Sequence, residues 1–147
     1  MGMIKDIKDK FFTQEIYNIY SHCMYKPTWK KFVSKAAEYM NNETTSIFGY
    51  YANEDIAGMI VVQKSGELPK VRGIAVDPQY RQQGIGKQFI QYACSSLDIT
   101  TLMAETDDDA VMFYRNCGFE TEEFMIMGDS GEHKRYKCTL HVALVKT

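Results

Sequence analysis

The residues best suited to chemistry lie in a short glycine turn, Asp77 to Phe89, which reads DPQYRQQGIGKQF. Glycine lets the backbone approach a ligand closely, because a side chain would hold a phosphate away from the amide groups. A turn that leads into a helix also gathers unpaired N–H groups at the positive end of the helix dipole. The turn therefore predicts a phosphate or pyrophosphate site, to which Arg81 and Lys87 can add positive charge.

Two common phosphate loops do not fit these letters. The Walker pattern requires glycine five residues before Gly86 and serine or threonine after Lys87, but Arg81 and Gln88 stand there. The dinucleotide fingerprint requires a third glycine where Phe89 stands. Taken alone, the turn is also compatible with an ordinary helix N-terminus that binds no ligand, where the glycines serve close packing.

The segments before the turn predict helices followed by strands. Apolar residues at helical spacing predict two helices within residues 13–41, the second starting near Thr28. From residue 44 to 78 the chain instead has β-branched and aromatic runs, cut by polar stretches at 53–55 and 65–67. These runs predict three successive strands.

The segments after the turn continue this mixture. Apolar residues four apart predict an amphipathic helix at residues 85–97, whose N-terminus lies on the glycines. Residues 100–106 read as a strand, and residues 119–127 and 134–145 read as two closing strands around a glycine-bounded turn. Between them, residues 106–118 predict a helix, with Thr106 and Asp109 in capping-box spacing and Gly118 as terminator.

Composition limits the classes of protein that need consideration. The chain has 147 residues, of which 45% are hydrophobic and 24% charged, and these values are typical of one globular domain spanning 1–147. Its formal net charge of -2 supplies no field that would attract nucleic acid. The longest apolar run, IAGMIVV, is too short to cross a bilayer. We therefore expect a cytoplasmic protein that binds neither nucleic acid nor membrane.

The cysteines indicate neither a metal site nor a redox pair. They lie far apart in the sequence and form no C-x-x-C motif; they are Cys23, Cys94, Cys117 and Cys138. We expect reduced thiols that are mostly buried, and no bound metal.

The turn and its surroundings resemble the GNAT family of N-acetyltransferases. The family's R/Q-x-x-G-x-G/A pattern is matched by Arg81-Gln82-Gln83-Gly84-Ile85-Gly86. Upstream, VRGIAVDPQY resembles the family's preceding strand and loop, and downstream Ala110 to Phe119 match its A-x-x-F-Y-x-x-x-G-F pattern. The matching segments span residues 71–120 in the family's order and spacing.

The resemblance implies both a fold and a reaction. The implied fold is α+β, a mixed and mostly antiparallel central sheet of about six to seven strands flanked by about four helices. The implied reaction moves the acetyl group of acetyl-CoA to an amine by direct attack in a ternary complex, without a metal. A non-catalytic module that senses or binds acyl-CoA is the alternative, because a fold does not guarantee its chemistry. Either a monomer or a homodimer is compatible with the sequence.

The resemblance also implies which residues hold the cofactor. Backbone groups of Ile74, Ala75 and Val76 would pair with the pantetheine amides like an added strand, which requires the 71–76 strand to part from the 100–105 strand. The pyrophosphate would lie on the turn formed by Arg81, Gln82, Gln83, Gly84, Ile85, Gly86 and Lys87. The second motif would contribute Asp107, Ala110, Phe113 and Tyr114. Many family members have asparagine where this chain has Asp107, and an ionised aspartate cannot donate a hydrogen bond, so capping the helix is its other expected role.

Three catalytic roles follow from the same resemblance. The backbone N–H of Val76 is the expected oxyanion donor, and Tyr114 is the expected general acid for the departing thiolate. Glu67 or Glu105 could remove a proton from the acceptor through a water molecule. An aromatic group near the N-terminus could line the acceptor pocket or simply belong to the core; it consists of Tyr17, Tyr20, Tyr25 and Trp29. The acceptor itself stays open among peptide α-amines, lysine side chains, polyamines and small antibiotics.

Overall fold

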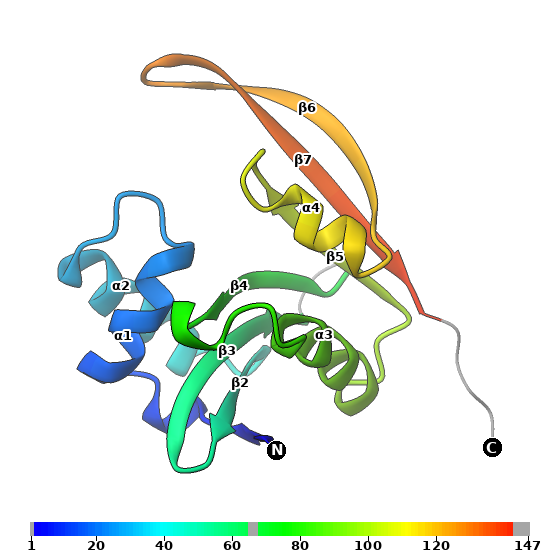
Figure 1. Cartoon of the computed structure of the whole chain (residues 1–147). Helices are drawn as coiled ribbons and strands as arrows, with labels where there is room; N and C mark the ends of the chain where they lie inside the picture. The colour runs from blue at the N-terminus through cyan, green and yellow to red at the C-terminus, as the bar shows by residue number, and fades with distance from the viewer. Residues whose placement is uncertain (1, 65–67, 143–147) are drawn as a thin grey trace.

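A mixed sheet of seven strands forms the centre of the described chain. The computed structural model describes residues 2–64 and 68–142. The strands lie in the order β1-β2-β3-β4-β5-β7-β6, and within the described residues only β4 and β5 pair in parallel (Figure 1). Their bounds are β1 (Gly2–Asp6), β2 (Thr45–Ala52), β3 (Asp55–Gln63), β4 (Lys70–Val76), β5 (Thr101–Thr106), β6 (Glu120–Gly128) and β7 (Gly131–His141).

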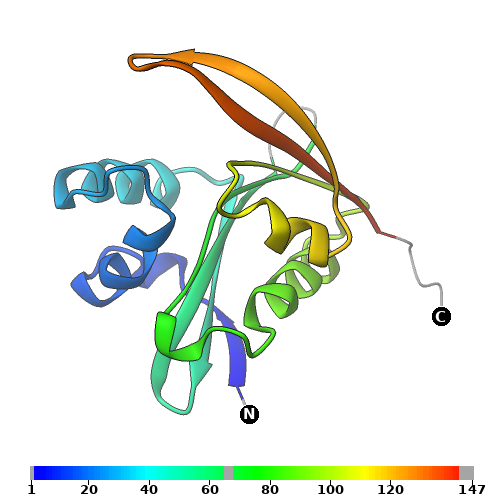
Figure 2. The same ribbon diagram turned by 45° about the horizontal axis from the view of Figure 1, so that its top comes forward.

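The helices cover both faces of this sheet (Figure 2). α1 and α2 pack with the 3₁₀ turn η1 on one face, while α3 and α4 pack on the other. The α-helices are α1 (Gln14–Tyr20), α2 (Trp29–Met40), α3 (Ile85–Ser96) and α4 (Val111–Asn116), and the 3₁₀ turns are η1 (Lys8–Lys10), η2 (Ser21–Cys23) and η3 (Pro78–Tyr80). No helix among the described residues has the length and apolar character needed to cross a bilayer.

Strand β3 joins the two cores because its residues alternate between the faces. Met59 and Val61 are buried against α1 and α2, whereas Ile60 and Val62 are buried against α3. An uninterrupted apolar run is what a strand needs when both of its faces are covered. The run that is too short for a bilayer is therefore the central strand of a two-sided core.

The predicted fold class is confirmed, and most predicted elements are present. The second N-terminal helix begins where expected, because the Thr28 hydroxyl accepts a hydrogen bond from the Lys31 N–H at 3.1 Å and caps it. One strand was not predicted: β1 pairs antiparallel with β2, from Gly2 opposite Ala52 to Asp6 opposite Phe48. Five residues with alternating exposure at a sheet edge carry too weak a pattern to be recognised in isolation.

The predicted start of the acidic helix is wrong. α4 begins at Val111, its N-cap is Ala110 without a side-chain cap, and Thr106 is the last residue of β5. The Asp107 carboxylate accepts the N–H groups of Asp109 and Ala110 at 3.0 and 3.3 Å. Such local side-chain bonds compete with helix formation, so the aspartates form a turn before the helix starts.

Thr45 provides a test of the packing at the start of β2. Its side chain is buried, and its hydroxyl has no hydrogen-bond partner among the described residues. Thr45→Val replaces the hydroxyl by a methyl group of similar size, so the free energy of unfolding should rise by about 1 kcal/mol. Urea denaturation measures this change. Thr45→Ser, which keeps the hydroxyl and deletes the methyl group, is the control and should destabilise; a loss of stability in Thr45→Val would refute the assignment.

Candidate functional site

The candidate site begins where β4 and β5 part. Their parallel pairing is limited to Lys70 opposite Met103, next to a hydrogen bond from the Met103 N–H to the Pro69 carbonyl at 2.9 Å. The β3–β4 register shifts between Val61 and Val62, which leaves Arg72 as an extra residue in β4. Past this bulge, no described strand pairs with the outer edge of β4. The sheet therefore has an open edge near its middle.

Alternation of the backbone decides which groups face this opening. The Asp77 N–H donates to the Ala57 carbonyl of the β3 hairpin at 2.7 Å, so Asp77 is directed toward β3. Successive residues of a strand point their N–H and C=O groups to opposite sides. Ile74 and Val76 therefore direct their backbone groups into the opening, while Ala75 directs its own toward β3, opposite Met59.

A cavity of about 1160 Å³ occupies the opening and collects most of the predicted site residues. The predicted residues that line it are Ile74, Ala75, Val76, Arg81, Gln82, Gly84, Ile85, Gly86, Glu105, Asp107, Ala110, Phe113 and Tyr114. Gln83 does not line it, and Lys87 instead lines a second cavity of about 580 Å³ between α3 and the end of β7. Glu67 lies outside the described residues.

The glycine turn presents a helix end that no side chain caps. Gln82 and Gly84 both adopt left-handed backbone conformations, with φ of 63° and 78°. Gly84 is the N-cap of α3, and a Cβ built on it would meet no atom within 4 Å. Among the described residues, no group accepts from the N–H groups of Ile85, Gly86 and Lys87. Free donors at a helix N-terminus beside open space can bind an anion.

Gly86 has a packing role in addition to the one its motif implies. A Cβ on Gly86 would lie 2.5 Å from Cε1 of the Phe113 ring. Gly86 is buried in the first turn of α3, and Phe113 belongs to α4. This glycine is therefore required by the close packing of α3 against α4, whereas Gly84 is the glycine with open space above it.

Arg81 lies along the open edge of β4. Its Nε donates to the Val76 carbonyl at 3.0 Å, so the side chain folds back toward the strand. The contact uses one of the two backbone groups by which Val76 faces the opening. It also places a positive charge between the edge of β4 and the N-terminus of α3.

Tyr114 is held by the C-terminal cap of α4. The Phe119 N–H donates to the Tyr114 carbonyl and the Gly118 N–H donates to the Arg115 carbonyl, both at 3.0 Å, with Gly118 at φ 95°. This is a Schellman motif, and the Tyr114 and Phe119 rings that accompany it lie 5.1 Å apart between centroids. Tyr114 is only 5% exposed, and burial raises the pKa of its hydroxyl well above the usual range. The hydroxyl therefore keeps its proton at neutral pH.

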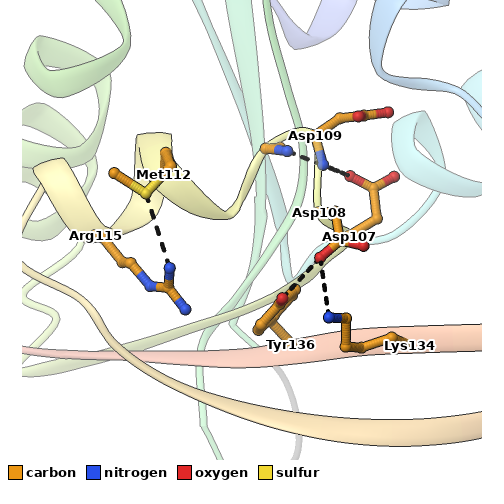
Figure 3. A network of polar contacts seen from close by, with 8 residues as sticks. Asp107, Asp108, Asp109, Met112, Arg115, Lys134 and Tyr136 are labelled. Atoms are coloured by element: carbon orange, nitrogen blue, oxygen red, sulfur yellow. Dashed lines mark hydrogen bonds and ion pairs between the residues drawn. The ribbon is translucent and has the colours of Figure 1, made fainter.

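The aspartate turn before α4 is fastened to β7 (Figure 3). The Tyr136 hydroxyl donates to Asp108 Oδ1 at 2.7 Å, and Lys134 Nζ lies 3.6 Å from the same oxygen. The hydrogen bond from Tyr136 lowers the pKa of Asp108, and Lys134 adds to the effect. Asp107 uses its carboxylate to accept backbone N–H groups of the turn before α4, and no side chain caps α4 itself.

Glu105 lines the cavity but is already paired. Lys70 donates a hydrogen bond to Glu105 Oε2 across the point where β4 and β5 part. This hydrogen bond lowers the pKa of Glu105, and the charges of Lys70, Arg135 and Lys137 lower it further. A carboxylate with a lowered pKa is a weaker base, so the pairing reduces its suitability as a proton acceptor.

The aromatic group predicted near the acceptor divides among the cavity, the core and the surface, where Trp29 is 42% exposed. Tyr25 lines the cavity. Trp29 packs edge to face against Tyr17 at 5.4 Å between ring centroids. Tyr20 is buried, and its hydroxyl lies so close to Gly73 that a Cβ there would clash with it.

Several cavity residues were not predicted from the sequence. They come from the η2 loop and from β4, η3, α4 and β7: His22, Cys23, Met24, Lys26, Arg72, Tyr80, Asn116 and Arg135. Their positions depend on how distant segments meet, so no local pattern identifies them. The Arg135 position follows only once the register of β7 against β5 is known.

Cys23 departs from the expectation of buried thiols. Cys94 and Cys138 are buried free thiols as expected, whereas Cys23 is exposed at the cavity. The protein atoms around Cys23 nevertheless solvate a thiolate poorly, and this desolvation raises the pKa of its thiol to about 11. Cys23 is therefore protonated at neutral pH.

The chain matches known acetyltransferases in sequence and in fold. Residues 8–140 match the sequence profile of the acetyltransferase (GNAT) domain family. A histone acetyltransferase of Glycine max is 40% identical over 58 residues, which cover 37% of this chain and 25% of that protein. The chain thus spans about a quarter of the length of the curated relatives that it matches.

Two solved structures illustrate the likeness in fold. The ribosomal-protein-S18-alanine N-acetyltransferase of Escherichia coli superposes with a TM-score of 0.74 at 20% identity, covering 99% of this chain and 97% of that chain. A proposed streptothricin acetyltransferase of Bacillus anthracis, solved in complex with acetyl coenzyme A, has a TM-score of 0.61 at 27% identity and covers 73% of this chain and 68% of that chain.

The packing role of Gly86 predicts a specific coupling with Phe113. Gly86→Ala should lower the free energy of unfolding by about 1 to 3 kcal/mol, because the added methyl group overpacks the α3–α4 contact. In a Phe113→Ala background the same substitution should cost much less, since the ring that it meets is gone. Denaturation of the four proteins in this cycle measures the coupling. Equal costs in both backgrounds would show that Gly86 does not serve this contact.

Proposed function

This chain belongs to the GNAT acetyltransferase family, and on that basis we propose that it moves the acetyl group of acetyl-CoA to an amine by direct attack. Family membership supports the assignment of an acyltransferase that uses acetyl-CoA. One observation carries the proposal: the unpaired edge of β4 and the uncapped N-terminus of α3 line the same cavity. That cavity thus offers backbone groups for an amide-bearing arm and free donors for a diphosphate.

The residues of the opening fit the two ends of acetyl-CoA. The N–H and C=O groups of Ile74 face the opening and can pair with pantetheine amides as a neighbouring strand would, whereas the Val76 carbonyl already accepts from Arg81 and the Val76 N–H is left for the thioester. The free N–H groups at the start of α3 can receive the diphosphate, to which Arg81 adds positive charge. Gly84 leaves the approach open, because its Cβ position meets no atom.

Two groups of the chain suit the transfer step. The acceptor nitrogen forms a bond to the thioester carbonyl carbon, the carbon–sulfur bond breaks, and the sulfur leaves with the bonding electrons. The Val76 N–H faces the opening and can donate to the carbonyl oxygen while negative charge develops there. Tyr114 holds its proton at neutral pH and can deliver it to the departing sulfur.

Direct attack is favoured over an acetylated enzyme by the state of Cys23. A cysteine nucleophile acts as the thiolate, and its reactivity falls when desolvation raises the pKa. Among the described cysteines, Cys23 is the one that lines the main cavity, and its pKa of about 11 leaves little thiolate at neutral pH. Cys23 is therefore poorly suited to carry the acetyl group, which supports direct attack by the acceptor amine.

The amine loses a proton when it is acetylated, and a base must take up that proton. Glu105 lies near the C-terminal end of β5 and lines the cavity, so it can act as a base through a water molecule. Its pairing with Lys70 makes this base weak, and transfer of the proton to solvent competes with it.

The class of the acceptor is tested by assay. The acceptors in the names of the similar proteins are a ribosomal-protein alanine, streptothricin and a histone, which differ in chemical class. Release of free thiol from acetyl-CoA should be measured with peptide α-amines, lysine peptides, polyamines and aminoglycosides. Turnover with at least one amine supports the proposal. Binding of acetyl-CoA without amine-dependent thiol release would instead indicate a binding module.

Binding of acetyl-CoA should stabilise the native chain. A ligand present at a hundredfold excess over its Kd adds about 2.7 kcal/mol to the stability, which a thermal shift assay detects. Gly84→Val should abolish most of this shift, because its side chain would enter the open space above the α3 N-terminus. Gly131→Val is the matched control: Gly131 also has a positive φ and an unobstructed Cβ position, but it lies in the β6–β7 turn. Equal shifts in both variants would exclude the turn as the binding site.

Tyr114→Phe should remove the general acid and keep the ring in place. A positioned general acid contributes about 10² to 10⁴ in rate, so kcat should fall by that factor with little change in acetyl-CoA affinity. The loss should be smaller with a thioester whose thiol is more acidic. Tyr92→Phe on α3, where the ring packs against Phe48, is the control and should keep full activity. A Tyr114→Phe enzyme within about threefold of the parent, far below that range, would assign Tyr114 to packing alone.

A further inference from the structure

The β6–β7 hairpin extends beyond the rest of the sheet. The last pair that β7 makes with β5 joins Tyr136 to Thr106. Past it, residues 131–135 of β7 and residues 124–128 of β6 pair only with each other within the described chain. Both ribbon views show this part of the hairpin rising clear of the helices (Figures 1 and 2).

This outer part of the hairpin exposes three successive apolar side chains, which alternate between its two faces. Met125, Ile126 and Met127 are 56%, 42% and 78% exposed. An isolated two-stranded hairpin is marginally stable in water, and an exposed apolar edge strand is a template for pairing with another strand. Charged residues protect the first half of β6, at Glu120, Glu122 and Glu123, but the second half has none. An additional strand paired with the second half of β6 would satisfy the free backbone groups on its outer edge and cover its apolar side chains.

We propose that a second copy of this chain supplies that strand. The two β6 strands pair antiparallel about a two-fold axis at Ile126, so that the sheets of both copies become continuous. This interface is independent of the acetyl-transfer chemistry. It nevertheless adjoins the site, because Arg135, which lines the cavity, pairs with Phe124 in the hairpin.

The alternation of side chains fixes this register. A two-fold axis normal to the sheet keeps each side chain on the same face of the sheet. Two residues that lie opposite each other must therefore both have even numbers or both have odd numbers. When the two-fold axis passes through Ile126, this residue lies opposite the partner's Ile126. Met125 then lies opposite the partner's Met127, and Phe124 opposite the partner's Gly128. All five positions from 124 to 128 are then apolar or glycine.

The neighbouring registers are less favourable. An axis at Met125 would place Glu123 opposite the partner's Met127. An axis at Phe124 would place two glutamates opposite apolar residues: Glu123 opposite the partner's Met125, and Glu122 opposite the partner's Ile126. A parallel in-register pair would set each glutamate on its own copy, which like charges oppose. In the Ile126 register, Glu123 lies opposite the partner's Asp129, which follows the end of β6 at Gly128, so the pairing is limited to the five apolar or glycine positions. Of the antiparallel registers centred on Phe124, Met125 and Ile126, the last is therefore the most self-complementary.

The mass of the full chain in solution tests the proposal first. Sedimentation equilibrium across a dilution series should give the mass of two chains for the parent. Ile126→Lys should weaken association at least about tenfold in Kd, which corresponds to about 1.4 kcal/mol. Met3→Lys is the matched control, because Met3 is 59% exposed on β1 at the opposite edge of the sheet, and it should leave the dimer intact. Circular dichroism confirms that each variant is folded.

Cysteine cross-linking tests the register itself. The two copies of Ile126 would have Cβ atoms about 4.5–5.5 Å apart, so Ile126→Cys should form an interchain disulfide under mild oxidation. The two copies of Glu122 would be about 27 Å apart, because eight residues at about 3.4 Å each separate them, and Glu122→Cys should not cross-link above the level of the parent with its native cysteines.

Four results would overturn the proposal. A parent that remains one chain throughout the series excludes the interface. A dimer that Ile126→Lys leaves intact, or that Met3→Lys dissolves, places the interface elsewhere. Cross-linking of Glu122→Cys as strong as that of Ile126→Cys refutes the register.

Discussion

The loss of pairing between β4 and β5 is the constraint on which the rest of the structure depends. A strand in the middle of a sheet normally satisfies the backbone groups on both of its edges, and buried groups left unpaired cost about 1–3 kcal/mol each. In this chain β4 keeps its pairing with β3 and gives up its pairing with β5 after one position. The edge that is released opens on a cavity, so water or a ligand can satisfy it. An open edge inside a sheet thus leaves backbone groups free to pair with a ligand.

The surrounding elements keep that opening in a fixed shape. β3 anchors β4 from a core that is closed on both faces, so β4 cannot shift to restore its pairing without disturbing two cores. Gly86 lets α3 lie against Phe113 of α4, and the cap at Gly118 fixes the end of α4 that carries Tyr114. On the other side, the bond from Tyr136 to Asp108 fastens the start of α4 to β7. The groups that face the cavity are therefore positioned by packing outside it.

Local patterns in the sequence predicted the parts of this arrangement that depend on local physics. The apolar run of β3, the Thr28 cap and the uncapped glycine turn each follow from a few neighbouring residues, and all are present. The sequence did not reveal β1, or the contribution of Cys23 and Arg135 to the cavity, because these depend on contacts between distant segments. It also did not separate the two glycines of the motif, since only the position of Phe113 distinguishes a packing glycine from an open one. The helix start was predicted too early because the Asp107 carboxylate accepts backbone N–H groups of the turn before α4.

The claim that the open edge of β4 receives acetyl-CoA can be measured at individual backbone groups. Amide hydrogen exchange followed by NMR reports each N–H separately. Acetyl-CoA should slow exchange at Ile74, Val76 and the first turn of α3, whereas Ala75, which faces β3, should be protected with or without the ligand. Saturating acetyl-CoA that left exchange at Ile74 and Val76 unchanged would show that the cofactor does not pair with β4, and would contradict the account.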